Sequence, residues 1–396
     1  MTPGAMTGVP DQEPRDEAAG LLGQMTTPLD GLYRRHPERN LAVISQAITG
    51  SYQGTGPIRL GPRRGLVVIA VDGLGYHPAR ATLTSADLSP LSSEFPTTTV
   101  ACLMTSVTGE PAGTHGFIGV QYLHANGRTL VNCHDGSTAG QTTAALARPT
   151  TAPVLRTIFD RLASAGTPVL ALPNELGFLH AGARGRLLHG ARVSGPALPA
   201  GDPADLVSAF ATQILAATAA EPDAMIWTYL DLDRHVHAHG FDQRAAAAMT
   251  ALDELARRLR DGGTSVLVFS DHGLARSVPS PATEAAWQTA SSERWCRLPP
   301  GGAGRIRWLY PHPGREDRLS SLLGRQLQDA IVVTSGQLAE LGYVAAGSVG
   351  QRRLGEVVLI ATGADFPVPD VTVAYEHGSM TAEEVLVPMA IWSAAR

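Results

Sequence analysis

Acidic residues and histidines follow apolar runs at several places along the chain, in a pattern that could hold metal ions. Asp72, Asp233 and the pair Asp271-His272 each come just after such a run. If these runs are strands of one parallel sheet, their carboxyl ends meet at one edge, where ligands of open α/β sheets bind. A lone aspartate after a strand can equally cap a helix. The hypothesis of a metal site therefore depends on several of these residues converging.

The segment 228–240 is dense in possible metal ligands. Asp233 and His237 are four residues apart, so one turn of helix would place both on one face. His235, His237 and His239 alternate, so in a strand they would share a face instead. Carboxylate and imidazole together suit zinc in either case. The alternative is a solvated polar loop.

A run of hydroxyl residues ending in Thr99 enters an apolar, helix-like stretch that reaches residue 109. A threonine in this position is ordinarily a helix N-cap. The functional alternative is a nucleophile at a helix N-terminus, where the helix dipole and a bound metal would both lower the pKa of the hydroxyl. The same end of a helix favours an anionic substrate such as phosphate.

The composition is that of a globular protein and excludes several enzyme classes. Of the 396 residues, 44% are hydrophobic and 17% are charged, which argues against disorder. The chain contains no lysine. This excludes a Walker A phosphate loop, a pyridoxal-phosphate Schiff base and the strand lysine of protein kinases. The net charge is −5, whereas a general nucleic-acid binder typically carries an excess of positive charge. We therefore expect no stable nucleic-acid partner.

The cysteines and the N-terminus indicate a reducing, cytoplasmic location. The three cysteines are widely spaced and suggest neither a disulfide framework nor a cysteine zinc site. The first 24 residues lack the basic and apolar regions of a signal peptide. No continuous apolar run approaches the roughly 18 residues of a membrane span. We therefore expect a cytoplasmic protein without a membrane segment.

Strand-like and helix-like segments alternate along most of the chain, which predicts an α/β fold with a mainly parallel central sheet flanked by helices. After His272 this rhythm gives way to a polar, Pro- and Gly-rich stretch, which predicts a small α+β cap insertion. The expected domains are an N-terminal leader and helix (1–60), a catalytic core (61–276 and 356–396) and the cap (277–355). The expected strands cover residues 66–71, 168–172, 225–230 and 265–270, and the expected helices cover 153–165, 203–220 and 244–260.

Several motifs occur in one order between residues 67 and 391: VDGLG, FPTTT, TGEPAGTHGFIG, DRHVH, SDHG and EHGSMTAEEVLVP. This set resembles the alkaline phosphatase superfamily, specifically its nucleotide pyrophosphatase/phosphodiesterase-like branch. The resemblance covers most of the chain after residue 60 and implies an alkaline-phosphatase-like fold. It also implies two divalent metal ions, for which we expect zinc, although manganese or iron would use similar ligands.

The resemblance implies a role for each residue of the site. Thr99 matches the nucleophile of the Phe-Pro-Thr-x-Thr pattern. One metal would be held by Asp72, Asp271 and His272 together with Thr99. The other would be held by Asp233, His237 and His377.

The sequence departs from the branch at two places. Val120 occupies the position where the branch usually has an asparagine that contacts a phosphoryl oxygen, which weakens a preference for nucleotide diesters. The spacing around Asp233 is also altered, which leaves His235 and His239 open as other ligands. His134-Asp135 could line the substrate pocket, although a segment of this kind more often lies outside a functional site. The chain has no Cys-x-Pro/Ser-x-Arg run, which argues against a formylglycine sulfatase.

These observations together predict a metal-dependent hydrolase that acts on a small phosphorylated substrate. A phosphodiesterase or nucleotide pyrophosphatase with a threonine nucleophile is the first expectation. A phosphomonoesterase is the second, and a phosphonate hydrolase using the same site is the third. A non-catalytic, metal-stabilised binding protein is the alternative from another class. The oligomeric state stays open.

Overall fold

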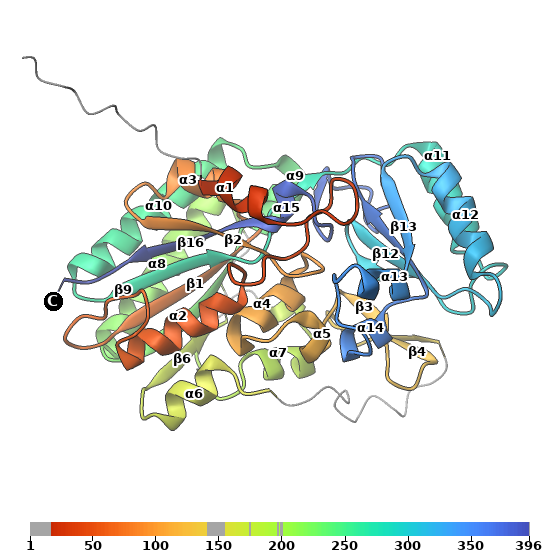
Figure 1. The fold of residues 1–396 in the computed structure, drawn as a ribbon. Helices are drawn as coiled ribbons and strands as arrows, with labels where there is room; N and C mark the ends of the chain where they lie inside the picture. The colour runs from red at the N-terminus through yellow and green to blue at the C-terminus, as the bar shows by residue number, and fades with distance from the viewer. Residues whose placement is uncertain (1–16, 141–154, 174–175, 196–197, 199–200, 396) are drawn as a thin grey trace, which may run out of the picture.

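The computed structural model describes residues 17–140, 155–173, 176–195, 198 and 201–395. The leader predicted before residue 17 and the start of the helix predicted at residue 153 lie outside the described residues. A seven-stranded sheet forms the centre of the larger part of the molecule (Figure 1). In spatial order its strands are β2 (Asp87–Ser92), β16 (Leu386–Trp392), β9 (Ser265–Ser270), β1 (Leu66–Asp72), β8 (Met225–Asp231), β6 (Val169–Leu172) and β7 (Arg192–Val193).

The central strand β1 is buried on both faces, which explains its continuous apolar sequence. Successive side chains point to opposite faces of a sheet. Accordingly, Leu66, Val68 and Ala70 join one hydrophobic cluster, while the intervening side chains join a second. Helices cover both faces of the sheet and contribute to both clusters (Figure 1), and the first cluster also contains residues of other strands.

Seven helices in the larger part of the molecule contribute to these two clusters as follows. The first cluster contains residues of α1 (Glu17–Gln24), α2 (Ala42–Gln53), α4 (Thr99–Thr108) and α6 (Ile158–Ser164). The second contains residues of α3 (Tyr76–Thr82), α8 (Pro203–Ala220) and α10 (Gln243–Asp261). The other helical segments of this part are α5 (Ala112–His115), η1 (Leu176–Phe178), α7 (Ala181–Leu187), α9 (Asp233–His239) and α15 (Ala382–Val385).

The predicted fold class is confirmed. Strands β9, β1, β8, β6 and β7 pair in parallel, and β16 is antiparallel to both of its neighbours. The helix predicted over 153–165 begins later, at Ile158. There the Thr157 side chain and Asp160 form a reciprocal capping box that fixes the first turn.

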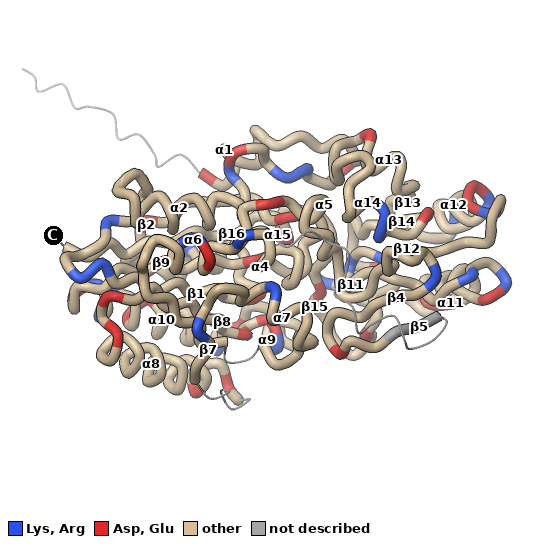
Figure 2. Tube along the Cα trace, turned by 90° about the horizontal axis from the view of Figure 1, so that it is seen from below, with Lys and Arg blue, Asp and Glu red and all other residues tan. Residues whose placement is uncertain are grey.

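A second seven-stranded sheet lies beside the first (Figure 1), and all of its strands pair antiparallel. Its strands in spatial order are β13 (Ala330–Thr334), β14 (Val357–Ala361), β12 (Ile306–Leu309), β11 (Gly301–Ala303), β3 (Gln121–Leu123), β4 (Thr129–Asn132) and β5 (Thr138–Gly140). Helices α11 (Pro281–Ala290) and α12 (Glu316–Gln326) share a hydrophobic cluster with this sheet, and Figure 2 shows them at one end of the molecule. Two short helices, α13 (Ser335–Glu340) and α14 (Val349–Arg353), complete this part.

Membership of the second sheet does not follow the predicted limits of the cap. The segment 277–355 supplies β11, β12 and β13, but β3 to β5 come from residues 121–140 and β14 lies beyond residue 355. The sequence shows where the rhythm of strands and helices changes, but it does not show which distant strands pair across a sheet. The domain limits themselves stay a prediction.

Two short strands carry the chain between the two sheets. β10 (Ala275–Arg276) pairs antiparallel with β15 (Tyr375–Glu376). This pairing brings the segment before His377 close to the segment that follows His272. Among the described residues, no helix combines the length and the apolar character that crossing a membrane requires.

Candidate active site

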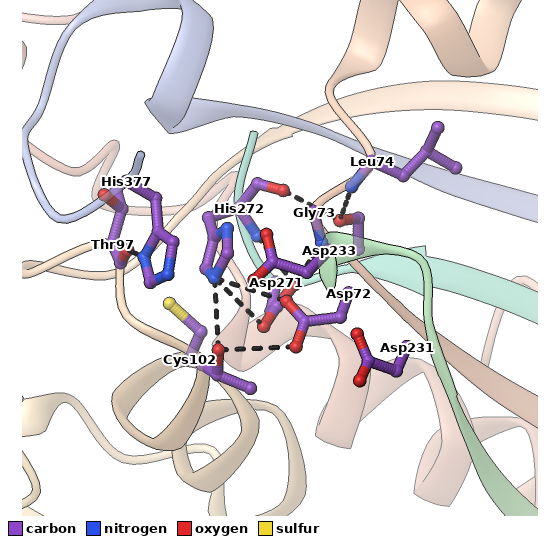
Figure 3. Close-up of polar contacts among 12 residues, drawn as sticks. Asp72, Gly73, Leu74, Thr97, Cys102, Asp231, Asp233, Asp271, His272 and His377 are labelled. Carbon is purple, nitrogen blue, oxygen red and sulfur yellow. Dashed lines mark hydrogen bonds and ion pairs between the residues drawn. The ribbon is translucent and has the colours of Figure 1, made fainter. Parts of the chain in front are cut away.

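The carboxyl ends of three neighbouring strands bring the predicted aspartates together. Asp72 ends β1, directly opposite Asp231 at the end of β8. Asp271 follows β9, whose last residue lies opposite Val71. Asp233 begins α9, two residues after β8 ends. Figure 3 shows Asp72, Asp233 and Asp271 gathered at this edge of the sheet, as the sequence pattern predicts.

Thr99 faces this cluster from the first turn of α4. Its Oγ1 lies 3.4 Å from Asp72 Oδ2 and 3.2 Å from His272 Nε2. The preceding residue, Thr98, occupies the N-cap position, but its side chain makes no capping hydrogen bond. The Thr98 hydroxyl is instead buried without a partner among the described residues. The end of α4 that points into the site therefore keeps its helix dipole without a side-chain cap.

Two histidines present Nε2 to the site because their Nδ1 atoms bond to backbone oxygens. His237 Nδ1 donates to the Tyr375 carbonyl at 2.6 Å, and its Nε2 lies 2.7 Å from Asp233 Oδ2. His377 Nδ1 donates to the Thr97 carbonyl at 2.7 Å. Metal-binding histidines are usually oriented in this way by a second hydrogen bond.

The Thr97 hydroxyl strengthens the connection between the segment before α4 and the segment of His377. It donates to the Ser379 carbonyl at 2.6 Å and accepts from the Gly378 amide at 2.9 Å. Three consecutive threonines therefore have different surroundings: Thr97 anchors the His377 segment, Thr98 occupies the N-cap and Thr99 faces the carboxylates.

The histidine-rich segment forms helix α9 and not a strand. Because this segment is helical, Asp233 and His237 share a face and are in contact. His235 is directed elsewhere, with its Nε2 2.9 Å from Asp242 Oδ1. Its ring also lies against that of His239, with centroids 4.7 Å apart. Neither of these histidines joins the three groups of possible ligands described next.

Buried carboxylates and imidazoles form three overlapping groups whose ligand atoms lie within 4.8 Å of one another. The groups are Asp72-Asp271-His272, Asp233-His272-His377 and His237-Glu376-His377. Buried atoms without a hydrogen-bond partner among the described residues include Asp72 Oδ1, Asp233 Oδ1, Asp271 Oδ2 and His272 Nδ1. Since buried polar atoms are normally paired, this donor set fits divalent cations.

The pKa values of the clustered carboxyl groups also favour a bound cation. Burial, reinforced by the neighbouring Asp271 and Asp233, raises the pKa of Asp72 well above its usual range. Burial and the charge of Asp233 raise the pKa of Asp271 to about 7. Burial also raises the pKa of Glu376 to about 7. Carboxylates gathered in this way repel one another when ionised, and a bound cation would remove that cost.

Asp233 and His237 behave as an ion pair inside this cluster. Although burial opposes both shifts, the contact with His237 lowers the pKa of Asp233, and the same contact raises the pKa of His237 to about 10. The pair is therefore charged at neutral pH in the protein described here.

A cavity of about 290 Å³ opens beside Thr99. Its polar lining includes Asp72, Asp233, His237 and His377, and its apolar lining includes Val120 and Phe178. The remaining lining residues are Thr98, Val100, His134, Tyr229, Asp231 and Arg234. The cavity thus joins the cluster of carboxylates to a surface that could hold an organic group.

Five of the seven predicted site residues line this cavity: Asp72, Thr99, Asp233, His237 and His377. The other two, Asp271 and His272, lie in the buried cluster behind it, where His272 Nε2 is 3.3 Å from Asp72 Oδ1 and 3.5 Å from Asp271 Oδ2. Three further residues belong to the site. The Tyr229 hydroxyl donates to Asp72 Oδ2. Glu376 Oε2 lies 3.9 Å from His237 Nδ1. His134, which the sequence suggested only weakly, lines the cavity. Alternation along β8 could have drawn attention to Tyr229, two residues before Asp231, but a tyrosine within an apolar strand is ordinarily part of the core.

Residues 66–312 match the family described as type I phosphodiesterase / nucleotide pyrophosphatase. The chain belongs to this family. Its members are hydrolases of phosphoric ester bonds that depend on divalent metal ions, which agrees with the candidate ligand groups. The sequence resemblance to the nucleotide pyrophosphatase/phosphodiesterase-like branch is therefore confirmed. A comparison with curated proteins found no match.

Several solved structures have a similar fold. Murine ectonucleotide pyrophosphatase / phosphodiesterase 5 is 15% identical, with a TM-score of 0.60 over 82% of this chain and 87% of its own. An inactive threonine-to-alanine variant of that protein in complex with AMP has a TM-score of 0.59 at 15% identity, with the same shares covered. Phosphonoacetate hydrolase from Sinorhizobium meliloti 1021, in complex with phosphonoformate, is 16% identical, with a TM-score of 0.59 over 85% of this chain and 91% of its own.

Proposed function

We propose that this family member hydrolyses phosphodiester or pyrophosphate bonds of a small substrate, with Thr99 as the nucleophile and two zinc ions as cofactors. The observation that carries the proposal is the position of the Thr99 hydroxyl. It lies at the uncapped N-terminus of α4, within 3.4 Å of Asp72 and 3.2 Å of His272. These are the surroundings that activate a hydroxyl and attract a phosphoryl group.

The proposed ligands follow the groups described above. Asp72, Asp271 and His272, together with Thr99, would hold one ion, and Asp233, His237 and His377 would hold the other. When bound, two divalent cations would lower the pKa of the hydroxyl and neutralise charge on the phosphoryl group and the leaving oxygen. The mixture of carboxylate and imidazole suits zinc, and manganese or iron could use similar ligands.

The residues of the chain then perform a two-step displacement. Thr99 Oγ1 forms a bond to phosphorus while the bond from phosphorus to the leaving oxygen breaks. The Thr99 proton passes to solvent as the bond forms, by way of Asp72 Oδ2, the carboxylate oxygen in contact with that hydroxyl, and the leaving oxygen takes up a proton from solvent. A water molecule next attacks phosphorus, restores the threonine hydroxyl and releases the phosphoryl product. The backbone amides at the start of α4 favour the negative charge on the phosphoryl oxygens throughout.

The name given to one murine structure supports the role of the threonine. That protein is described as inactive when one threonine is replaced by alanine, and its structure contains AMP. A loss of activity on removing a threonine hydroxyl agrees with a threonine nucleophile. By analogy, we propose a small phosphorylated substrate for this chain as well.

A second candidate function is phosphomonoester or phosphonate hydrolysis at the same site. The observation that favours it is Val120, which lines the cavity with an apolar side chain. This residue offers no hydrogen bond to a phosphoryl oxygen, which weakens the case for nucleotide diesters. The fold is also similar to that of phosphonoacetate hydrolase.

Paired initial rates on bis-p-nitrophenyl phosphate and p-nitrophenyl phosphate would test the proposal. Rates are measured after chelation and again after addition of zinc. Zinc-restored preference for the diester supports the first candidate, and preference for the monoester supports the second. Zinc that binds without restoring either rate would favour the non-catalytic alternative, provided that a set of natural phosphoesters and phosphonates is inert as well.

The Thr99→Ala variant tests the nucleophile directly. We expect kcat to fall by about 10³-fold or more, because loss of a nucleophile removes the first chemical step. Thr108→Ala is the matched control, since it removes a buried hydroxyl from the other end of the same helix, bonded to the Met104 carbonyl at 2.6 Å. Full activity of the zinc-reconstituted Thr99→Ala protein would exclude Thr99 as the nucleophile.

A further inference from the structure

The second sheet contributes one histidine to the cavity beside Thr99. His134 follows β4 and lines the same cavity as Thr99 and Asp233. Its ring packs edge-on against Phe178, with centroids 5.1 Å apart and planes at 80°. Burial lowers the pKa of His134, so its imidazole is neutral at neutral pH and offers one N–H donor.

Backbone hydrogen bonds hold the turn of His134 in place. The Cys133 amide donates to the Val120 carbonyl at 2.8 Å, and the Cys133 carbonyl accepts from the His180 amide at 2.9 Å. The His134 amide donates to Asn132 Oδ1 at 2.8 Å. These hydrogen bonds fix the chain up to His134, which follows directly on the residue that pairs with Val120.

Most other polar side chains around the cavity already have partners. Tyr229 donates to Asp72, and the Arg234 guanidinium lies 2.8 Å from Asp231 Oδ2. His237 and His377 donate through Nδ1 to backbone carbonyls. An ionised carboxylate accepts hydrogen bonds but cannot donate them. Phosphoryl oxygens are also acceptors, and among the groups named here the Arg234 guanidinium keeps N–H donors beyond the one on Asp231.

Two lining side chains stand apart from this set. The Thr98 hydroxyl has no partner among the described residues, but it belongs to the turn of the proposed nucleophile. No hydrogen bond to the imidazole of His134 is found within the part of the chain that the structure describes. A neutral N–H donor is therefore available at the wall where Val120 provides none.

From this arrangement we infer that His134 contacts the substrate and donates a hydrogen bond to a phosphoryl oxygen, supplying the donor that Val120 lacks. This inference rests on the proposed function, because it assumes that the phosphoryl group binds at Thr99. It makes the second sheet part of the catalytic machinery and not only a cover over it. A preorganised donor of this kind acts most strongly on the charge that develops in the transition state.

Two substitutions separate the hydrogen bond of His134 from its packing. His134→Phe keeps an aromatic ring against Phe178 but removes the donor, while His134→Gln keeps a donor. With zinc-reconstituted enzyme, we expect His134→Phe to lower kcat/KM by about 10- to 100-fold, the range for removal of one hydrogen bond to a charged group. His134→Gln should lose less. Inhibition by orthovanadate, which mimics the pentacoordinate phosphoryl group, should weaken in parallel.

A donor returned at position 120 gives an independent test. The double variant His134→Phe/Val120→Asn should recover part of the lost kcat/KM, because asparagine supplies an N–H at the neighbouring position. His124→Ala is the matched control, since His124 lies at the other end of β4, in the turn between β3 and β4, and its Nδ1 accepts from the Asn126 amide at 3.3 Å. It should leave kcat/KM and vanadate inhibition unchanged.

The outcomes distinguish this inference from the proposed function. If kcat/KM and vanadate inhibition of His134→Phe stay within twofold of the values for His124→Ala, the inference is overturned while Thr99 keeps its role. Loss of bound zinc from His134→Phe would also overturn it, because His134 would then act as a ligand. If Thr99→Ala is fully active, the proposed function itself fails, whatever His134 does.

Discussion

Tyr229 shows how a single side chain supports the candidate metal ligands. Its hydroxyl is buried and donates to Asp72 Oδ2, and this hydrogen bond lowers the pKa of Asp72 against the larger opposite effect of burial. The phenol therefore favours the ionised carboxylate that a cation needs. The hydrogen bond engages Oδ2, while Oδ1 stays without a partner among the described residues.

We predict that Tyr229→Phe weakens metal binding without emptying the site. Loss of an outer hydrogen bond to a ligand typically lowers metal affinity by about 10- to 100-fold. The measurement is zinc retention during titration with a chelator, together with kcat at saturating zinc. Tyr343→Phe is the control, because its buried hydroxyl donates to the Leu32 carbonyl at 2.7 Å. Equal zinc affinities of the two variants would contradict the prediction.

At the residue scale, the sequence predicts the candidate metal ligands better than the residues that surround and support them. Asp72, Asp271 and His272 follow buried strands, so their meeting at one sheet edge can be inferred from pattern. Glu376 and His134 lie on segments whose position depends on distant pairings, such as the contact of β15 with β10. Because no local sequence pattern marks such residues, the sequence alone gives little indication that they lie at the site.

The element that most tightly constrains the segment of His377 is the turn between β11 and β12. Gly304 adopts φ +43°, and a Cβ there would lie 2.0 Å from the His377 carbonyl oxygen and 2.4 Å from Glu376 Oε2. The next amide, that of Arg305, donates to the same carbonyl at 2.6 Å. The Arg305 side chain is buried, and its Nε lies 3.1 Å from Glu384 Oε2.

We predict that Gly304→Ala impairs the site by displacing His377. The new methyl group would overlap backbone, so the segment must move, and we expect at least a tenfold loss of both kcat/KM and zinc affinity. A misplacement of about 1 Å can cost a hundredfold in rate. Gly314→Ala is the matched control: it also has a positive φ, +79°, but no atom lies within 4 Å of its Cβ position. Both variants lose some stability, and only Gly304→Ala should lose zinc. Equal zinc affinities would refute this role of the turn.

At the element scale, the central strands are the most predictable part. The runs over 66–71, 225–230 and 265–270 correspond closely to β1, β8 and β9, because strands buried on both faces have continuous apolar sequences. The strands of the second sheet are harder to predict. β3 and β11 have three residues each, which is too short for a hydrophobic period to emerge.

At the scale of the whole molecule, the candidate site joins parts that are distant in the sequence. Asp72, Asp233 and Asp271 belong to the central sheet, while His377 is held by the turn that precedes β12 of the second sheet. Bound metal would therefore connect the two sheets as well as supply chemistry. The second sheet also takes strands from outside the predicted cap segment 277–355, because β3 to β5 and β14 belong to it.

Removal of the metal should accordingly lower the stability of the whole protein. Without cations, several buried carboxylates share one site, and burial raises the pKa values of Asp72, Asp271 and Glu376. A ligand that binds only the folded state stabilises it by about 4 kcal/mol at a thousandfold excess over its Kd. We therefore expect the thermal midpoint to fall on dialysis against a chelator and to return on addition of zinc.

The Asp233→Asn variant makes this prediction specific to the site. It removes one charge from the ligand set, so zinc should raise its midpoint less than that of the unaltered protein. Asp261→Asn is the control, because Asp261 is exposed and contacts Arg260 at the far end of α10. That variant should keep the full response to zinc. If the unaltered protein has the same midpoint with chelator and with zinc, the cluster of Asp72, Asp233 and Asp271 does not hold a stabilising metal, and the metal-dependent proposal loses its physical basis.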